Sequence, residues 1–145
     1  MKTNTTYDFS YFQLTLLDFL KESHPKKADD VRFVKEKAKE AMDTYLSAIH
    51  DGYISTTAQE LANEVLFKGL LFSKHDMLVS VLWNEFPDII AHSEAKEFAV
   101  KIENESEIVF SKYYLSDDFD YSPEYDKLYT ELTGFIDIWL EEHEL

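Results

Sequence analysis

The chain has 145 residues, a formal net charge of −15, and 45% hydrophobic and 15% aromatic residues. This apolar content is enough for one packed domain and excludes a disordered tail. The absence of Cys excludes disulfide scaffolds, thiol nucleophiles and cysteine-based metal sites. Three Gly and three Pro leave few turns, which favours long helices over a sheet.

Two amphipathic helices are predicted before residue 55. The first covers about 8–23 and ends ahead of Pro25, because the residue before a proline is pushed out of the helical region. The second begins at Asp29 or Asp30 and buries a stripe that runs from Val31 to Ile49. It stops at Gly52, the residue type best suited to a left-handed C-cap.

The next two helices are predicted from their start signals. The string Thr57-Ala-Gln-Glu60 fits a capping box and opens a third helix, whose end is apolar on nearly every face. A fourth helix follows Ser73 and ends before Pro87.

Two more helices complete the predicted all-α fold. A long helix is expected over 93–113, and a final one from Ser122 as N-cap, with Pro123 at its first helical position. The sequence therefore predicts a six-helix bundle in a single domain, 1–145.

The order short helix, long helix, aromatic-Ser cap, helix occurs twice. Shifts of 62, 64 and 67 residues lay the first three predicted helices on the last three. The first shift places Leu16, Leu17, Leu20 and Pro25 on Leu78, Val79, Leu82 and Pro87. We infer two three-helix halves, about 8–71 and 72–145, related by internal duplication.

The negative charge lies in the second half. Residues 1–72 hold eleven Asp/Glu and nine Lys/Arg, net −2, whereas residues 73–145 hold eighteen and five, net −13. Direct binding of nucleic acid or of an anionic membrane is therefore disfavoured. The charge either keeps the protein soluble or forms a docking face for a basic partner.

No targeting or membrane segment is expected. The longest run without an acidic or basic residue is 9–17, less than half of a membrane span, and MKTNTTYDFS lacks the apolar core of a secretory signal. We expect a cytoplasmic protein.

Glu85 is the strongest single candidate for a functional residue. It lies in the arc defined by Leu78, Val81 and Leu82, so its carboxylate either points at the core with a raised pKa or reaches solvent at the helix end. A buried Glu85 with a second carboxylate in a cleft would support a small hydrolase.

Asp117, Asp118 and Asp120 form an acidic cluster before Ser122. The EF-hand pattern fails, because Pro123 stands where that loop needs Gly and Tyr129 stands where it needs Glu. We interpret the cluster as an acidic cap ahead of a helix dipole.

The remaining motifs exclude several chemistries. No two of the five histidines have the spacing of a helical metal site, and three scattered glycines exclude phosphate loops and nucleophile elbows. No metal or cofactor is expected. Aromatic residues crowd the last third. Tyr121 in this part and Trp83 in the fourth predicted helix are candidate contact positions, together with the acidic residues above.

Several strings resemble the bacterial family catalogued as domain of unknown function 1896. They are Glu60-Leu-Ala-Asn-Glu-Val-Leu-Phe-Lys-Gly-Leu70, Phe72-Ser-Lys, Leu82-Trp-Asn-Glu-Phe86, Tyr114-Leu-Ser-Asp-Asp-Phe119 and Leu128-Tyr-Thr-Glu-Leu-Thr-Gly134. The resemblance extends from Tyr11 to the Trp139-Leu-Glu-Glu142 end. It implies a small helical cytoplasmic protein, often encoded near conjugative mobile elements, and supplies no catalytic residues.

These observations favour a non-enzymatic interaction or accessory module. It would bind an unidentified basic protein through its acidic, aromatic-rich second half, or a second copy of itself through surplus apolar surface. Two alternatives stay open at this point: an acidic nucleic-acid mimic that blocks a DNA-binding enzyme, and the carboxylate-based hydrolase around Glu85.

Overall fold

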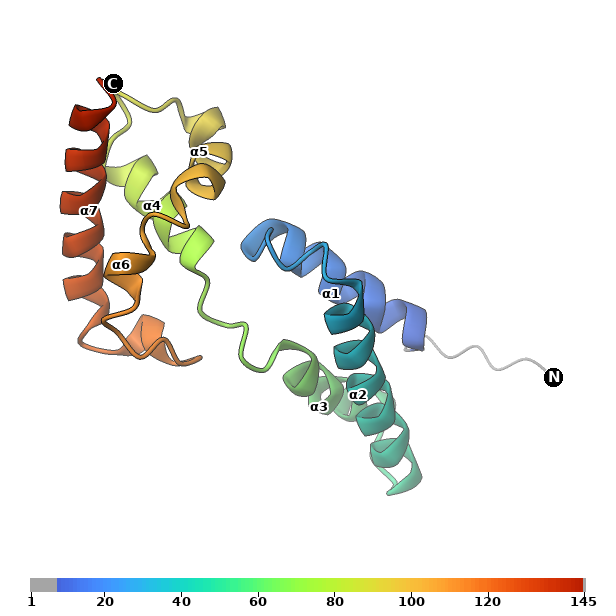
Figure 1. The fold of residues 1–145 in the computed structure, drawn as a ribbon. Coiled ribbons are helices and arrows are strands. Elements are labelled where there is room, and N and C mark those ends of the chain that lie inside the picture. The colour runs from blue at the N-terminus through green and yellow to red at the C-terminus, as the bar shows by residue number, and fades with distance from the viewer. Residues whose placement is uncertain (1–7, 145) are drawn as a thin grey trace. The chain divides into compact units, whose positions relative to one another are not determined.

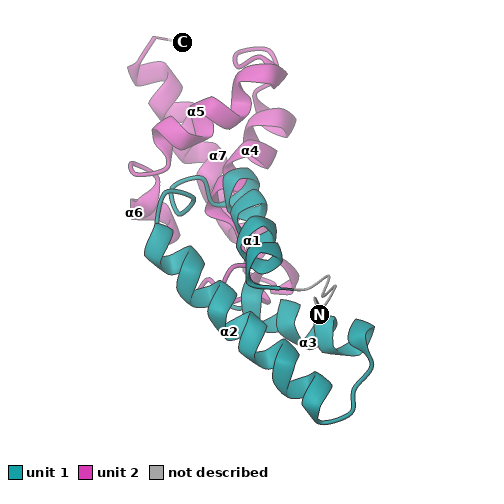
Figure 2. Ribbon diagram, turned by 90° about the vertical axis from the view of Figure 1, so that its right-hand side faces the viewer, with its two compact units in different colours: residues 1–68 teal, residues 69–145 magenta. Residues whose placement is uncertain are grey.

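The protein is known from a computed structural model that describes residues 8–144. In this range the chain forms seven α-helices and two 3₁₀ helices, without a strand (Figure 1), so the all-α prediction is confirmed. The chain forms two compact units, residues 1–68 (unit 1) and residues 69–145 (unit 2), shown in different colours in Figure 2. No helix in the described range has both the length and the hydropathy that crossing a bilayer requires.

Unit 1 consists of α1 (Phe9–Ser23), α2 (Val31–His50) and α3 (Ser55–Phe67). α2 packs against both α1 and α3 (Figure 2). Its buried stripe is rich in alanine, which allows neighbouring backbones to approach closely. The buried apolar residues of these helices are Phe12, Leu16, Leu20, Val34, Ala38, Ala41, Tyr45, Ala48, Ala58, Ala62 and Leu66.

The boundaries of α1 and α2 follow local chemistry. Asp8 accepts a hydrogen bond from the backbone N–H of Tyr11, and Asp30 accepts one from Phe33, so each carboxylate caps a helix N-terminus. Gly52 follows α2 with φ of +97°, as expected of a left-handed residue at a helix end. These predictions are confirmed.

Unit 2 is built around α4 (Lys74–Glu85), which packs against α5 (Ala95–Ile102) and α7 (Tyr125–Glu142). Figure 1 shows the long α7 beside α4. Three short helices complete the unit: η1 (His92–Glu94), α6 (Glu107–Phe110) and η2 (Phe119–Tyr121). Its fully buried large side chains are Leu78, Leu82, Ile102, Phe110, Leu128, Leu132, Ile136 and Leu140.

The prediction of one long helix over 93–113 is wrong. The chain instead forms η1, then α5, then a turn over 103–106, then α6. Ser106 is fully buried in this turn and donates its hydroxyl to the carbonyl of Glu103 at 2.7 Å. Such local side-chain bonds compete with helix continuation, so the apolar stripe persists while the helix does not. Because the described residues form seven α-helices, the predicted number of six is also wrong.

Two predicted helix starts are also wrong. α3 begins at Ser55, two residues before Thr57, and no side chain caps it. α7 begins at Tyr125, also without a side-chain cap, because the Ser122 hydroxyl donates to the carbonyl of Phe119 at 2.9 Å instead. The predicted stripe of α2 is too long as well, since Val31 and Ile49 are exposed at its two ends.

Candidate functional site

The six candidate positions all lie in unit 2, at two places on its surface. Trp83 and Glu85 lie at the end of α4, and the other four, Asp117, Asp118, Asp120 and Tyr121, lie in and just before η2. Tyr121 is 91% exposed and therefore presents nearly its whole ring to solvent. The candidate residues therefore lie at two separate places on unit 2 and do not form a single site.

Trp83 connects the end of α4 to η1. Its indole stacks on the imidazole of His92, with ring centroids 4.2 Å apart and planes 10° apart. Its Nε1–H donates to the carbonyl of His92 at 3.1 Å. The outer face of the indole remains partly exposed, so Trp83 is both a structural contact and an accessible aromatic surface.

Glu85 is exposed and does not point into the core. Its Oε2 accepts a hydrogen bond from Tyr129 Oη at 2.9 Å, and Asn84 Nδ2 donates to the same phenol oxygen at 3.3 Å. Burial raises the pKa of Tyr129; the Asn84 bond lowers it and the Glu85 bond raises it. The desolvated carboxylate that a hydrolase would need at Glu85 is absent, so that alternative is rejected.

Asp117 does not cap α7. Its Oδ2 accepts from the backbone N–H of Gly69 at 2.8 Å, and its Oδ1 accepts from that of Leu71 at 3.1 Å. The carboxylate thus binds the segment that enters unit 2, forty-six and forty-eight residues earlier in the chain. No periodicity or capping pattern in the sequence signals this partnership.

Asp118, just before η2, and Asp120, within it, are both exposed. Asp118 is the N-cap residue of that helix, but its side chain makes no capping bond. Partial desolvation of its carboxylate, together with the charge of Asp76, raises the pKa of Asp120. In the described range no three His, Asp or Glu side chains are grouped so that they could hold a metal ion.

An ion-paired cluster on α7 has no counterpart among the sequence candidates. Glu131 accepts from Lys112 Nζ at 2.6 Å and from the hydroxyl of Tyr113. These two bonds lower the pKa of Glu131, and the bond to Glu131 raises the pKa of Tyr113 to about 12. A phenol held protonated by a carboxylate is stabilised rather than activated, so Tyr113 is not an activated nucleophile.

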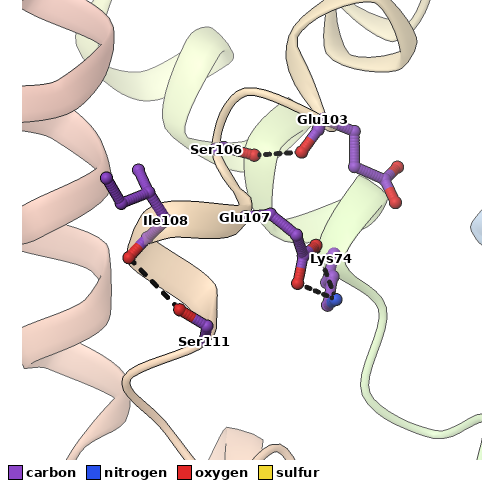
Figure 3. A network of polar contacts seen from close by, with 6 residues as sticks. All are labelled: Lys74, Glu103, Ser106, Glu107, Ile108 and Ser111. Carbon is purple, nitrogen blue, oxygen red and sulfur yellow. Dashed lines mark hydrogen bonds and ion pairs between the residues drawn. The ribbon is translucent and has the colours of Figure 1, made fainter.

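A second polar connection joins α4 to α6 (Figure 3). Lys74 Nζ lies 2.8 Å and 2.7 Å from the two carboxylate oxygens of Glu107. The same ammonium lies 5.6 Å from the ring centroid of Phe110. These contacts hold the short α6 in place.

Aromatic side chains connect the C-terminal part of α7 with α5. Trp139 donates its Nε1–H to Glu105 at 2.7 Å and packs edge-on against Phe98, and Lys101 lies over both rings. His143 stacks on the indole, with ring centroids 3.7 Å apart. Phe98 and Trp139 fall within the helices predicted over 93–113 and from Ser122, but Glu105 lies in the turn that interrupts the first of these, so the sequence gives no sign of its bond to Trp139.

Two surface clefts accompany these features. One in unit 2, of about 240 Å³, is lined by Ile90, Glu94, Glu97, Phe98 and Lys101. The other, in unit 1, has a volume of about 390 Å³ and a mainly apolar lining. Its residues are Ser10, Gln13, Leu14, Leu17, Ala28, Val31 and Val34.

Comparisons with known proteins agree with this helical architecture. The family described as Domain of unknown function (DUF1896) matches residues 4–145. The crystal structure of protein PG0816 from Porphyromonas gingivalis is similar to this chain, with 39% identity and a TM-score of 0.90. That match covers 94% of this chain and 93% of the other. A comparison with curated proteins finds no match. The family match spans almost the whole chain, and the protein therefore belongs to the DUF1896 family.

Proposed function

We propose that the protein is a non-enzymatic, cytoplasmic interaction module that binds a basic protein surface through unit 2. The observation that carries this proposal is the division of charge between the two units. Unit 2 has eighteen acidic and five basic residues, net −13, whereas unit 1 has eleven and nine, net −2. A surface of such uniform sign attracts a basic partner at long range and repels acidic ones.

Exposed aromatic side chains on the same unit support the proposal. Trp83, Tyr114 and Tyr121 all present part of their rings to solvent, and Tyr and Trp are enriched in protein interfaces. The cleft beside α5 places Glu94 and Glu97 next to the ring of Phe98. The chain's own Lys101 already lies over this ring, so a lysine or arginine of the partner would pair with the two carboxylates rather than with the ring.

The test is capture of partners by the tagged protein at about 50 mM and about 500 mM salt. The variant Glu94→Gln/Glu97→Gln removes two charges from unit 2, and Glu60→Gln/Glu64→Gln removes two exposed charges from unit 1 as a matched control. We expect wild type and the control to retain one basic protein at low salt, and the unit 2 variant to retain several-fold less. Equal capture by both variants, or recovery of the protein alone, contradicts the proposal.

A second candidate is a nucleic-acid mimic, since the same net charge of −13 resembles that of a short phosphate backbone. In this case the basic partner is a DNA-binding protein, and duplex DNA competes for it. Release of the captured partner by duplex DNA, but not by an equal charge of polyglutamate, supports mimicry. Equal release by the two polyanions supports general electrostatic docking.

We also propose that the two units arose by duplication, with α1, α2 and α3 corresponding to α4, α5 with α6, and α7. The boundary at residues 68 and 69 lies close to the division predicted from the repeated order of helices. Superposition of unit 1 on unit 2 tests this proposal. Agreement of all three helix positions in one handedness supports it, and opposite handedness rejects it.

A further inference from the structure

The cleft of unit 1 has the size and lining of a small-molecule site. It is formed by α1, the connection after it and the first turn of α2, helices that Figure 2 shows in contact, and its volume is about 390 Å³. Ligand sites usually measure about 300–1,000 Å³ and combine a mainly apolar lining with a few polar groups. All of the lining lies between residues 10 and 34, so the cleft belongs to unit 1 alone.

Apolar side chains make up most of this lining. Val34 is buried and Leu17 is half-buried, whereas Leu14 and Val31 are 61% and 62% exposed. Apolar side chains scattered singly over a surface need no explanation, but these two lie exposed around one cleft. A ligand that covers them removes apolar surface from water, which is the main driving force for binding of this kind.

None of the lining residues is charged. An ionised group placed here loses its hydration and gains no ion pair from the lining, which is costly. A neutral hydroxyl or amide loses less, and it finds hydrogen-bond partners in Ser10 and Gln13, the two polar side chains of the lining. The lining therefore selects an uncharged ligand with one small polar group.

The two polar residues mark one end of the cleft. Ser10 and Gln13 lie in the first half of α1, whereas Ala28 and Val31 lie in and just after the connection that follows α1. Along the helix axis Ser10 and Leu17 are about 10 Å apart, at 1.5 Å per residue. An extended chain advances about 1.2 Å per bond, so about eight carbons span this distance.

The small extent of the cleft favours a small ligand over a second copy of the chain. A protein interface of ordinary size uses about 20–30 residues on each side. The cleft is lined by seven residues, which is too few for a stable interface of that kind.

We propose that this cleft binds a neutral aliphatic chain of about eight carbons that ends in a hydroxyl or a similar small polar group. The chain lies against Leu14, Leu17 and Val31, and its polar end bonds Ser10 or Gln13. The site is separate from the docking of a basic protein by unit 2, so either proposal can fail without the other.

Titration of the intact protein with 1-hexanol, 1-octanol and 1-decanol, followed by NMR of the backbone amides, tests the proposal. We expect saturable shifts at the cleft residues, with an affinity that rises about fourfold for each added CH₂ from hexanol to octanol and levels off at decanol, when the cleft is full. Octanoate and octyltrimethylammonium should bind at least about tenfold more weakly than 1-octanol, because each brings a charge to an uncharged lining. Absence of saturable shifts at the cleft, or equal binding of the charged and uncharged chains, overturns the proposal.

Leu14→Gln and Leu46→Gln form a matched pair of variants. Each replaces an exposed leucine of unit 1 with a residue that forms helices about as well, and only Leu14 lines the cleft. We expect Leu14→Gln to bind 1-octanol about tenfold more weakly than wild type, and Leu46→Gln to match wild type. Val31→Thr, which keeps the shape of the side chain and adds a hydroxyl, should also weaken binding and serves if Leu14→Gln fails to fold. Equal affinity of the cleft variants and Leu46→Gln contradicts the proposal.

Dilution of the protein without any alkanol distinguishes the other occupant, a second copy. We expect the amides of the cleft residues to keep their positions at all protein concentrations. Shifts of these amides with rising concentration, together with dimers in sedimentation, would show that a second copy fills the cleft and would overturn the assignment to a small ligand.

Discussion

At the residue scale, the pairing of Tyr113 with Glu131 makes folding stability depend on pH in two windows. The folded state lowers the pKa of Glu131, so its contribution is present above the ordinary carboxyl value and is lost as the pH falls through the lowered one. The folded state raises the pKa of Tyr113 to about 12. Its contribution is therefore complete below the ordinary value of 10.0 and is lost as the pH rises toward about 12.

We expect Tyr113→Phe to unfold at lower urea concentration than wild type between about pH 6 and pH 9, where both groups hold their favoured charge states. The difference should shrink at both extremes. Urea denaturation followed by circular dichroism measures it, and absorbance of tyrosinate should show that the variant lacks a late-titrating phenol. Tyr121→Phe, which removes the hydroxyl of an exposed tyrosine, is the control. A difference that does not change with pH would contradict the role of the pair.

At the scale of the element, the N-terminus of α4 depends on one hydroxyl. Ser73 is buried and its Oγ accepts from the backbone N–H of Asp76 at 2.9 Å. Loss of an N-cap typically costs about 1 kcal/mol, so Ser73→Ala should lower the free energy of unfolding by about that amount. Thr57→Ala is the informative comparison, because the sequence predicts a cap there and the structure shows none. Equal losses in both variants would show that the cap assignment is wrong.

The end of α7 has the opposite character, because its last turn carries Glu141 and Glu142 and no basic residue. Negative charge at a helix C-terminus opposes the helix dipole. Glu142→Lys should therefore raise the free energy of unfolding above that of Asp137→Lys by about 0.3–1 kcal/mol. The two variants change the net charge equally, so their difference in thermal or urea denaturation isolates the end effect. If Asp137→Lys gains as much, repulsion over the whole unit accounts for the result.

Helix existence could be predicted from the sequence, because apolar spacing and residues such as Asp30, Gly52 and Ser73 act locally. The break after α5 could not. The helical spacing of apolar residues continues from Ile102 in α5 to Val109 in α6, so it gives no sign of the turn between the two helices. In the structure the turn is marked by the buried hydroxyl of Ser106.

Long-range partnerships are also invisible in the sequence. The bonds from Gly69 and Leu71 to Asp117 depend on tertiary folding and leave no periodic pattern. The helical position of Glu85 left both a buried and an exposed carboxylate open, and in the structure Glu85 is the last residue of α4 and its side chain is exposed.

At the scale of the whole molecule, the unequal charge of the two units should make their stabilities respond differently to salt. Repulsion among like charges destabilises a compact state, and it acts over about 30 Å at 0.01 M salt but only about 8 Å at 0.15 M. Unit 2, at net −13, should therefore gain protection between these concentrations, whereas unit 1, at net −2, should gain little. Hydrogen exchange resolved by residue measures both units in one sample of the intact protein.

The increase in the protection of unit 2 should depend on its net charge and not on a general effect of salt on folding. Reversing several exposed acidic residues of α7, such as Asp137 and Glu141, should reduce the response of unit 2 and leave unit 1 unchanged. Equal protection of the two units by salt would mean that the surface of unit 2 already accommodates its charge locally, through pairs such as Lys112 with Glu131. The long-range field on which the docking proposal depends would then be much weaker than the net charge indicates, so this measurement also tests the premise of that proposal.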